Sequence, residues 1–343
     1  MALILGLESS CDDSAAALVT SDRRILAAAV VGQDAAHRPF GGVVPEIAAR
    51  AHVEMLPGLI RRVLDEAEIE ISQVDAIAAT AGPGLIGGVM VGLLAGKGIA
   101  LAARKPLIAL NHLEGHALSP RLADPDLDFP YLLRLVSGGH CQLLDVRDVD
   151  DYRRLATTID DAAGEAFDKA AKLLGLAYPG GPAMEALAAE GDPAAVPLPR
   201  PLLGSAEPHF SFAGLKSAVQ RAVASGTFAP ADIAASFQQA VIDCLLDRTA
   251  KALEASAAPT LVVAGGVAAN RAVRAALSAL AEAHGRRFSV PPAWLCTDNA
   301  AMIAWAGAER FAAGLIDPLD VPARARWPLD ADADRVRGAG VKA

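Results

Sequence analysis

Aromatic side chains are scarce in this sequence. Phe, Trp and Tyr make up 4% of its 343 residues, although apolar residues together make up 53%. A hydrophobic core must therefore be built mainly from Ala, Leu, Val and Ile. The length suits about two domains of roughly 150 residues each.

Cysteine is also rare, and none of the four cysteines forms a C-x-x-C pair. This argues against a disulfide framework and favours reduced thiols. The first residues show no basic segment ahead of an apolar one, and Glu8 and Asp12 follow at once. They predict a strand where a secretory signal would need an apolar run, so we expect a cytoplasmic protein.

Positive charge is in deficit, and long apolar runs are few. The net charge of −9 argues against broad electrostatic adhesion to nucleic acid or anionic lipid, but leaves room for a local basic strip. Only residues 85–103 approach membrane-spanning length, and they contain Lys97 and five glycines. This composition favours a tightly packed helix of a soluble protein, with no membrane partner.

Two catalytic signatures are missing: Walker A and G-x-S-x-G. Their absence disfavours ordinary NTPases and serine hydrolases. What the chain does contain is four loops rich in Gly, Ser or Asp, at residues 8–14, 82–88, 137–140 and 265–270. Loops of this kind bind phosphate through backbone N–H groups, and several of them together indicate a nucleotide-like ligand.

Two apolar hairpins with polar tips, at residues 3–19 and 132–144, suggest a duplicated α/β architecture. Helical spacing marks residues 45–67, 231–257 and 299–313, and short buried strands are expected at 74–80, 107–110 and 261–264.

His112 and His116 lie four residues apart, so both can reach one ion from the same helix face. Asp298 is a candidate third ligand, and three ligands with open positions are typical of a working metal. The alternative is an ordinary helix face. Glu114 follows His112 by two positions, about 200° around a helix, which disfavours a metallopeptidase.

Residues 159–169 place Asp161, Glu165 and Asp168 on one side of a predicted helix, followed by a Gly-Gly turn at 180–181. The ordinary interpretation is a solvated face. The alternative is a site for sugar hydroxyls.

The motifs together resemble the tRNA threonylcarbamoyltransferase (TsaD) family, long mislabelled as glycoproteases, over roughly residues 3–330. The resemblance rests on ten segments: residues 8–12, 41–46, 81–85, 112–116, 136–140, 159–169, 178–181, 211–216, 265–271 and 296–299. It implies an actin-like (ASKHA) α/β fold with two ribonuclease-H-like domains and an interdomain cleft. We therefore expect an N-terminal lobe of residues 1–106 plus about 300–330, a second lobe of 107–299 carrying the metal and adenylate loops, and a flexible tail of 331–343.

The resemblance also implies the chemistry. The family moves a threonylcarbamoyl group from threonylcarbamoyl-AMP to N6 of the adenosine 3′ to the anticodon, in tRNAs that read codons beginning with A. One Fe²⁺ per subunit would be bound by His112, His116 and Asp298, although Zn²⁺ would also fit. Asp12 is the candidate catalytic group. The expected substrate-binding residues are Leu135, Val136, Ser137, Gly138, Gly139, Asp168, Gly181 and Asn270.

The implied partners are tRNA, a shortened paralogue (TsaB) and a small ATPase (TsaE). Asp13, Cys141, Ala213 and Ala268 depart from the family's usual residues and affect fine ligand contacts. Two rival functions remain open, a small-molecule kinase of the same fold and a non-catalytic nucleotide-binding scaffold. Candidate phosphate contacts on tRNA are Arg38, Arg50, Arg61, Arg62, Arg200, Lys216 and Arg221.

Overall fold

Two structural units make up the chain in the computed structural model, which describes residues 1–40, 42–177, 179–334 and 336. Unit 1 consists of residues 1–126 and 297–331. Unit 2 consists of residues 127–296 and the described residues after 331. Each unit contains its own five-stranded sheet.

The sheet of unit 1 has the strand order β3-β2-β1-β4-β5. The strands β1, β2 and β3 are antiparallel neighbours, whereas β1, β4 and β5 run parallel. Buried Ala, Leu, Ile and Val dominate β1, β2, β4 and β5, as expected for strands covered on both faces. Their bounds are β1 Leu3–Glu8, β2 Asp13–Thr20, β3 Ile25–Gly32, β4 Ala76–Gly82 and β5 Leu107–Asn111.

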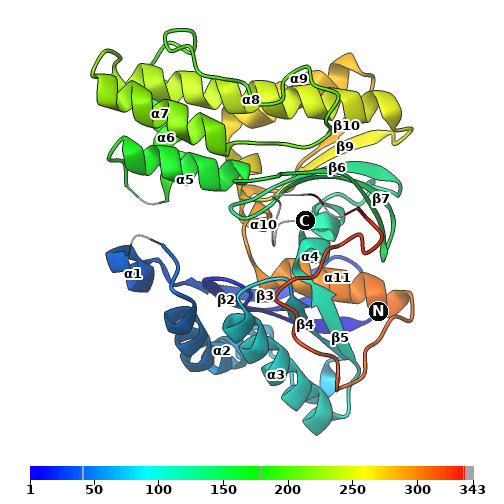
Figure 1. Cartoon of the computed structure of the whole chain (residues 1–343). Helices are drawn as coiled ribbons and strands as arrows, with labels where there is room; N and C mark the ends of the chain where they lie inside the picture. The colour runs from blue at the N-terminus through cyan, green and yellow to red at the C-terminus, as the bar shows by residue number, and fades with distance from the viewer. Residues whose placement is uncertain (41, 178, 335, 337–343) are drawn as a thin grey trace. The chain divides into compact units, whose positions relative to one another are not determined.

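Helices cover both faces of this sheet (Figure 1). The helices of unit 1 are α1 Asp34–His37, α2 Pro45–Ala67, α3 Ile86–Ala103, α4 His112–Ala123 and α11 Ala300–Ala312, with short 3-10 turns η1 Arg38–Phe40 and η2 Ile71–Gln73. A Cβ on Gly6 of β1 would lie 2.5 Å from the carbonyl oxygen of Ala300. The backbone of α11 therefore packs directly on β1, at a distance that only glycine permits.

The sheet of unit 2 has the strand order β10-β9-β6-β7-β8. Its strands are β6 Tyr131–Val136, β7 Cys141–Asp148, β8 Asp151–Thr157, β9 Thr260–Ala264 and β10 Arg287–Ser289. Its helices are α5 Ala163–Leu173, α6 Gly180–Ala188, α7 Ala213–Ser225, α8 Pro230–Ala255, α9 Arg271–Ala283 and α10 Ala293–Cys296, with the 3-10 turn η3 Gly266–Ala269.

The two sheets have the same topology. In each unit, the first strand pairs with the second in an antiparallel hairpin and with the fourth in parallel. The third and fifth strands then occupy opposite edges. The duplicated α/β architecture predicted from the two hairpins is therefore confirmed.

The division between the units differs from the lobe boundaries expected from the sequence. Residues 107–126 belong to unit 1, because β5 pairs with β4 and α4 packs against α11. Asp298 also belongs to unit 1, so all three candidate metal ligands lie in it and not in the second lobe. Of the expected flexible tail, residues 335 and 337–343 lie outside the described part.

One described helix, α3, is long and apolar enough to cross a membrane by length and composition alone. Such a helix is weak evidence for a membrane span, because core helices of soluble proteins have the same properties. Here α3 packs against β4 of the sheet and against α2.

Candidate metal centre

The two histidines stand at the start of α4, where β5 ends. Asn111 closes β5, and its side-chain oxygen accepts a hydrogen bond from the backbone N–H of Leu113 at 2.9 Å. This N-cap makes His112 the first residue of the helix. His112 and His116 are 5% and 0% exposed, and their ring centroids are 4.8 Å apart.

Asp298 comes from the other segment of unit 1, immediately before α11. Asn299 caps that helix by accepting the N–H of Met302 at 2.9 Å. The Oδ1 atom of Asp298 lies 3.1 Å from Nε2 of His116 and 3.4 Å from Nε2 of His112. The structure thus brings Asp298 to two histidines that precede it by 182 and 186 positions in the sequence.

These distances fit a metal ion. Ligand atoms about 2.1 Å from one ion lie about 3.0 Å apart at octahedral angles and about 3.4 Å apart at tetrahedral angles. All three potential ligand atoms lie within 4.8 Å of one another. The donor set of two imidazoles and one carboxylate, with further positions open, suits a catalytic transition metal.

Glu8 fixes the orientation of His112. Its Oε2 atom accepts a hydrogen bond from Nδ1 of His112 at 3.0 Å, which leaves Nε2 of the ring to face Asp298. Glu8 is in turn held by the Thr80 hydroxyl at 2.6 Å and the Ser10 N–H at 2.5 Å. Carboxylates commonly orient metal-binding histidines in this way.

The electrostatics favour a cation at this position. Burial acts to raise the pKa of Asp298, but His112 and His116 reverse this and hold it well below its usual range. Burial acts to lower the pKa of His112, but Asp298 and Glu8 outweigh burial and raise it well above its ordinary value. The carboxylate of Asp298 therefore stays ionised between the two rings.

Glu114 does not join this group. Its carboxylate lies 3.3 Å from the guanidinium of Arg310 on α11, and it is 2% exposed. Glu114 is therefore not placed to act as a base on a metal-bound water, in agreement with the helix geometry inferred from the sequence.

The β1–β2 turn adds further carboxylates to unit 1. Burial raises the pKa of the Cys11 thiol, and Asp12 and Asp298 raise it further, so the turn shares the electrostatic environment of the metal ligands. Burial also raises the pKa of Asp13 to about 7, with Asp298 and Asp12 contributing.

In unit 2, glycine-rich segments converge at the end of β6. A Cβ on Gly265 would lie 2.4 Å from the carbonyl oxygen of Val136, and one on Gly164 would lie 2.7 Å from that of Ser137. The Glu165 N–H donates to the carbonyl oxygen of Gly138 at 3.1 Å. The 137–139 turn, the start of α5 and the loop after β9 therefore form one backbone-lined region.

Comparisons with known proteins identify the family. The family described as "TsaD: tRNA N6-adenosine threonylcarbamoyltransferase" matches residues 24–305. The chain belongs to the TsaD family. Proteins named tRNA N6-adenosine threonylcarbamoyltransferase from Sphingopyxis alaskensis and Novosphingobium aromaticivorans are 75% and 68% identical to it, over the full length of both chains.

The fold of this TsaD-family chain also resembles solved structures. Component A of the (R)-2-hydroxyglutaryl-CoA dehydratase of Acidaminococcus fermentans aligns with a TM-score of 0.56, at 19% identity, covering 91% of this chain and all of the other. Together with the repeated sheet topology, this likeness confirms the predicted actin-like fold.

The residues of this TsaD-family chain that the sequence predicts to bind substrate lie in unit 2. Leu135 and Val136 end β6, and Ser137, Gly138 and Gly139 form the turn after it. Asp168 accepts the N–H of Gly180, 2.9 Å away at the start of α6, where Gly181 is the next residue. Asn270 caps α9, accepting from the Val273 N–H and donating to Gln238. Their roles in binding stay predictions.

Sequence reasoning missed His52. It is fully buried on α2, and its Nδ1 atom lies 2.7 Å from the Ser14 hydroxyl and 3.3 Å from the amide nitrogen of Gln33. Since both neighbours can donate to Nδ1, the proton is placed on Nε2, which donates to the Cys11 carbonyl oxygen at 3.1 Å. His52 therefore anchors the turn that carries Asp12. The sequence shows it only as one more residue on the apolar face of a helix.

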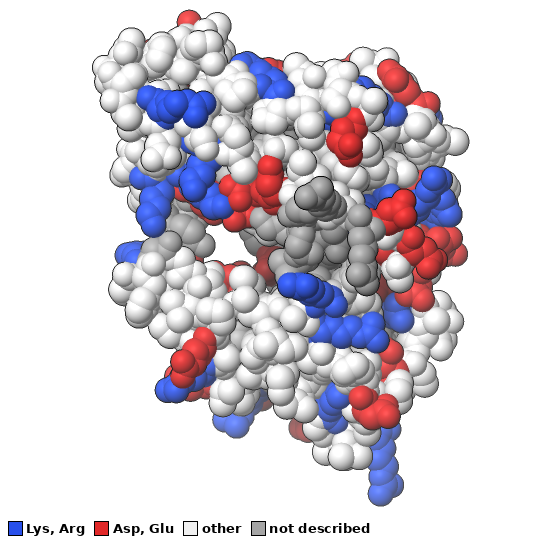
Figure 2. Space-filling model, in the orientation of Figure 1, with Lys and Arg blue, Asp and Glu red and all other residues white. Residues whose placement is uncertain are grey.

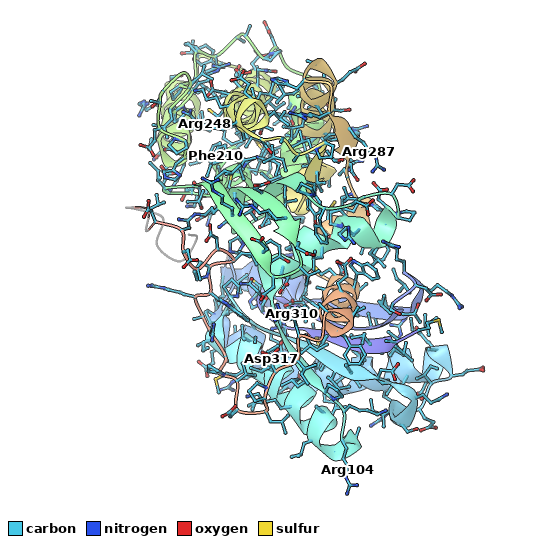
Figure 3. The ribbon with its side chains drawn as sticks, turned by 90° about the vertical axis from the view of Figure 1, so that its right-hand side faces the viewer. Arg104, Phe210, Arg248, Arg287, Arg310 and Asp317 are labelled. Carbon is cyan, nitrogen blue, oxygen red and sulfur yellow. The ribbon has the colours of Figure 1, made fainter. Side chains whose placement is uncertain are left out.

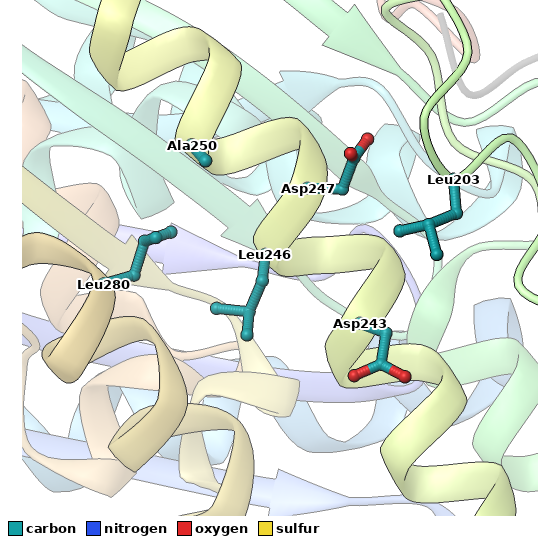
Figure 4. A pocket seen from close by; sticks show the side chains of 6 residues that line it. All are labelled: Leu203, Asp243, Leu246, Asp247, Ala250 and Leu280. Atoms are coloured by element: carbon teal, nitrogen blue, oxygen red, sulfur yellow. The ribbon is translucent and has the colours of Figure 1, made fainter.

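A groove on unit 2 contains none of the residues predicted to bind metal or substrate. It has a volume of about 410 Å³ and is lined by side chains of α8, α9 and the 201–204 loop, as Figure 4 shows. Its two carboxylates are already paired, Asp243 with Arg200 at 2.9 Å and Asp247 with Lys251 at 3.1 Å. None of the predicted site residues lines it.

Proposed function

We propose that this chain transfers a threonylcarbamoyl group to N6 of an adenosine in tRNA, the reaction that its family name describes. The donor is threonylcarbamoyl-AMP, and the acceptor is the adenosine 3′ to the anticodon in tRNAs reading codons that begin with A. The observation that supports this best is the His112, His116 and Asp298 group in a chain that matches the family over most of its length.

The reaction needs orientation more than covalent catalysis. The N6 amine attacks the carbamoyl carbonyl carbon, the bond to the phosphate oxygen breaks, AMP leaves and the amine loses a proton. A mixed anhydride of this kind has a good leaving group, so holding the two reactants in line supplies much of the rate.

The residues divide these tasks in our proposal. Backbone N–H groups of the 137–139 turn and the loop after β9 hold the adenylate, with Asp168 and Gly181 on the ribose side and Asn270 near the adenylate. Asp12 orients the incoming amine or accepts its proton. His112, His116 and Asp298 hold the metal, and Glu8 orients His112 through its Nδ1 hydrogen bond.

We propose Fe²⁺ as the metal, because two histidines and one carboxylate with open positions suit that ion, although Zn²⁺ is also compatible. A metal bound here would act as a Lewis acid on the acyl or phosphoryl oxygens. Metal analysis of chain purified without oxygen would decide between the two ions. The proposal also includes cooperation with a shortened paralogue and a small ATPase, whose addition should raise turnover.

The decisive test is mass spectrometry of tRNA nucleosides after incubation with threonylcarbamoyl-AMP. We expect threonylcarbamoyladenosine with the wild type, little with His112→Ala, and a normal yield with His284→Ala, which alters a histidine of unit 2 at the end of α9. Full modification by His116→Ala in cells would favour the scaffold alternative. A phosphorylated small molecule formed from ATP would favour the kinase alternative.

A further inference from the structure

A segment near the end of unit 1 runs from the amino end of β5 to the carboxyl ends of β4 and β5. We call residues 318–327 the C-terminal strap. The strap begins directly after Asp317, which is hydrogen-bonded to β5. The N–H of Asp317 donates to the Leu107 carbonyl oxygen at 2.8 Å, and the Asp317 carboxylate accepts the Ala109 N–H at 2.9 Å. From there the strap runs past the ends of β4 and β5.

Main-chain hydrogen bonds hold the strap in place. The N–H of Arg324 donates to the carbonyl oxygen of Ala81 at 2.7 Å, and the Gly84 N–H donates to the carbonyl oxygen of Ala325 at 3.3 Å. Gly82 has φ of +143°, and a Cβ there would lie 2.0 Å from the Arg324 carbonyl oxygen. The strap therefore approaches the end of β4 at a distance that only glycine accommodates.

Two arginines project from this fixed backbone. The side chains of Arg324 and Arg326 are exposed, and neither makes an ion pair within the described residues. The guanidinium of Arg324 lies over the ring of Trp327, 4.7 Å from its centroid. Trp327 itself packs on the core of unit 1, so Arg324 is partly ordered before any ligand binds.

Two exposed arginines with no ion pair in the described part of the chain stand out against a net charge of −9. Figure 2 shows basic and acidic side chains interspersed over the visible face. Three of the arginines expected from the sequence to contact RNA are already paired: Arg50 with Glu46 at 2.6 Å, Arg62 with Glu66 at 2.7 Å, and Arg200 with Asp243 at 2.9 Å.

Two hydrogen-bonded routes connect the strap to the metal centre. The Trp327 carbonyl accepts a hydrogen bond from the Asn111 side chain at 3.0 Å, and Asn111 is the residue before His112. The other route begins at Gly84, whose N–H donates to Ala325 of the strap. Leu85 follows Gly84 in the sequence, and its N–H donates to the Ser10 carbonyl oxygen at 2.8 Å. The Ser10 hydroxyl in turn lies 3.1 Å from Nδ1 of His112.

From this arrangement we propose that the C-terminal strap binds the phosphate backbone of the RNA substrate through Arg324 and Arg326, next to the metal-bearing helix. The proposal rests on the proposed function for the identity of the RNA. Guanidinium groups bind phosphate through two parallel hydrogen bonds, and a backbone held by main-chain contacts loses little entropy on binding. RNA bound here lies beside the end of unit 1 that carries His112.

The test compares two double variants of the full chain. R324E/R326E reverses the charge of both strap arginines. R24E/R104E makes the same change of charge at exposed arginines at the amino ends of the strands, where Arg104 points away from the end of α3 (Figure 3). Affinity for the unmodified tRNA is measured by fluorescence anisotropy over a range of salt concentrations, and modification is measured with threonylcarbamoyl-AMP.

We expect the strap variant to bind tRNA at least about tenfold more weakly, because two charge-assisted contacts are lost. Its plot of log affinity against log salt should be shallower by about 1.4–1.8, since each phosphate contact contributes about 0.7–0.9. KM for tRNA should rise while kcat at saturating tRNA stays near the wild-type value. The control variant should match the wild type in all three.

Equal affinities and salt slopes for the strap variant and the wild type would overturn the proposal, as would the absence of tRNA binding by the wild-type chain at low salt. Loss of a protein partner with unchanged tRNA affinity would assign the strap to that partner instead. Thermal unfolding checks that R324E/R326E is folded. If the wild type bound tRNA through the strap but formed no modified nucleoside, the proposed function would fail and the binding surface would stand.

Discussion

The hydrogen bond from His112 to Glu8 should control how tightly the group of His112, His116 and Asp298 binds a metal ion. The change is Glu8→Gln, which keeps the size of the side chain and removes its charge. Glu8 is 1% exposed and accepts from three donors: the Ser10 N–H, the Thr80 hydroxyl and Nδ1 of His112. A glutamine has one oxygen, so in either orientation its NH₂ group faces at least one of these donors.

Loss of such an orienting carboxylate typically weakens metal binding about 10- to 100-fold, which is about 1.4–2.7 kcal/mol. The donor left without an acceptor costs roughly 1–3 kcal/mol of folding stability as well. We therefore expect both the metal dissociation constant and the free energy of unfolding to change. Competition with a chelator of known affinity, without oxygen, measures the first, and urea unfolding measures the second.

Glu114→Gln is the matched control, because Glu114 is equally buried on α4, the helix of His112 and His116, but faces Arg310. It should lose stability and keep its metal affinity. If Glu8→Gln kept its metal dissociation constant within twofold of the wild type, or if both variants lost affinity equally, Glu8 would have no specific role at the metal.

Three further results are expected. Asp13→Asn should stabilise the metal-free chain more at pH 8 than at pH 4. Because the pKa of Asp13 is raised to about 7 in the folded chain, the folded state loses stability relative to the unfolded state as the pH rises above the ordinary pKa of an aspartate, and the asparagine variant avoids this loss. Thermal unfolding of the variant and the wild type at the two pH values measures the difference. Gly6→Ala should lower the free energy of unfolding by roughly 1–3 kcal/mol, because its Cβ would meet the α11 backbone at 2.5 Å, whereas Gly98→Ala, with no atom nearby, should not; urea denaturation compares them. Arg310→Ala should destabilise the chain by roughly 3–5 kcal/mol by breaking its buried pair with Glu114, and a chelator titration of the folded variant should still give the wild-type metal affinity.

The sequence predicted the features that depend on local pattern. The hairpins revealed the duplication, because each one brings its two strands together through a short turn. The spacing of His112 and His116 placed both on one helix face, and the angle to Glu114 separated it from them. Motif resemblance supplied the family, which the comparisons confirm.

Features that depend on distant contacts were not visible. Glu8 and His112 are 104 positions apart, and no spacing rule links them. The boundary expected at residue 106 lies at 126, because β5 depends on its parallel pairing with β4 for its place in the sheet. The C-terminal strap has no periodicity, since its path follows hydrogen bonds to the ends of other strands.

The discontinuity of unit 1 has a consequence for the order of events during synthesis. Residues 1–126 leave the ribosome first, but the strap, α11 and Asp298 follow only after residues 127–296 have been made. At roughly 5–20 residues per second, this interval is on the order of 10–30 seconds. Throughout it, the face of β1 that α11 will cover is exposed and the two histidines lack their carboxylate. An apolar strand face of this kind is one that chaperones recognise, and the three candidate metal ligands come together only after residue 298 has been made.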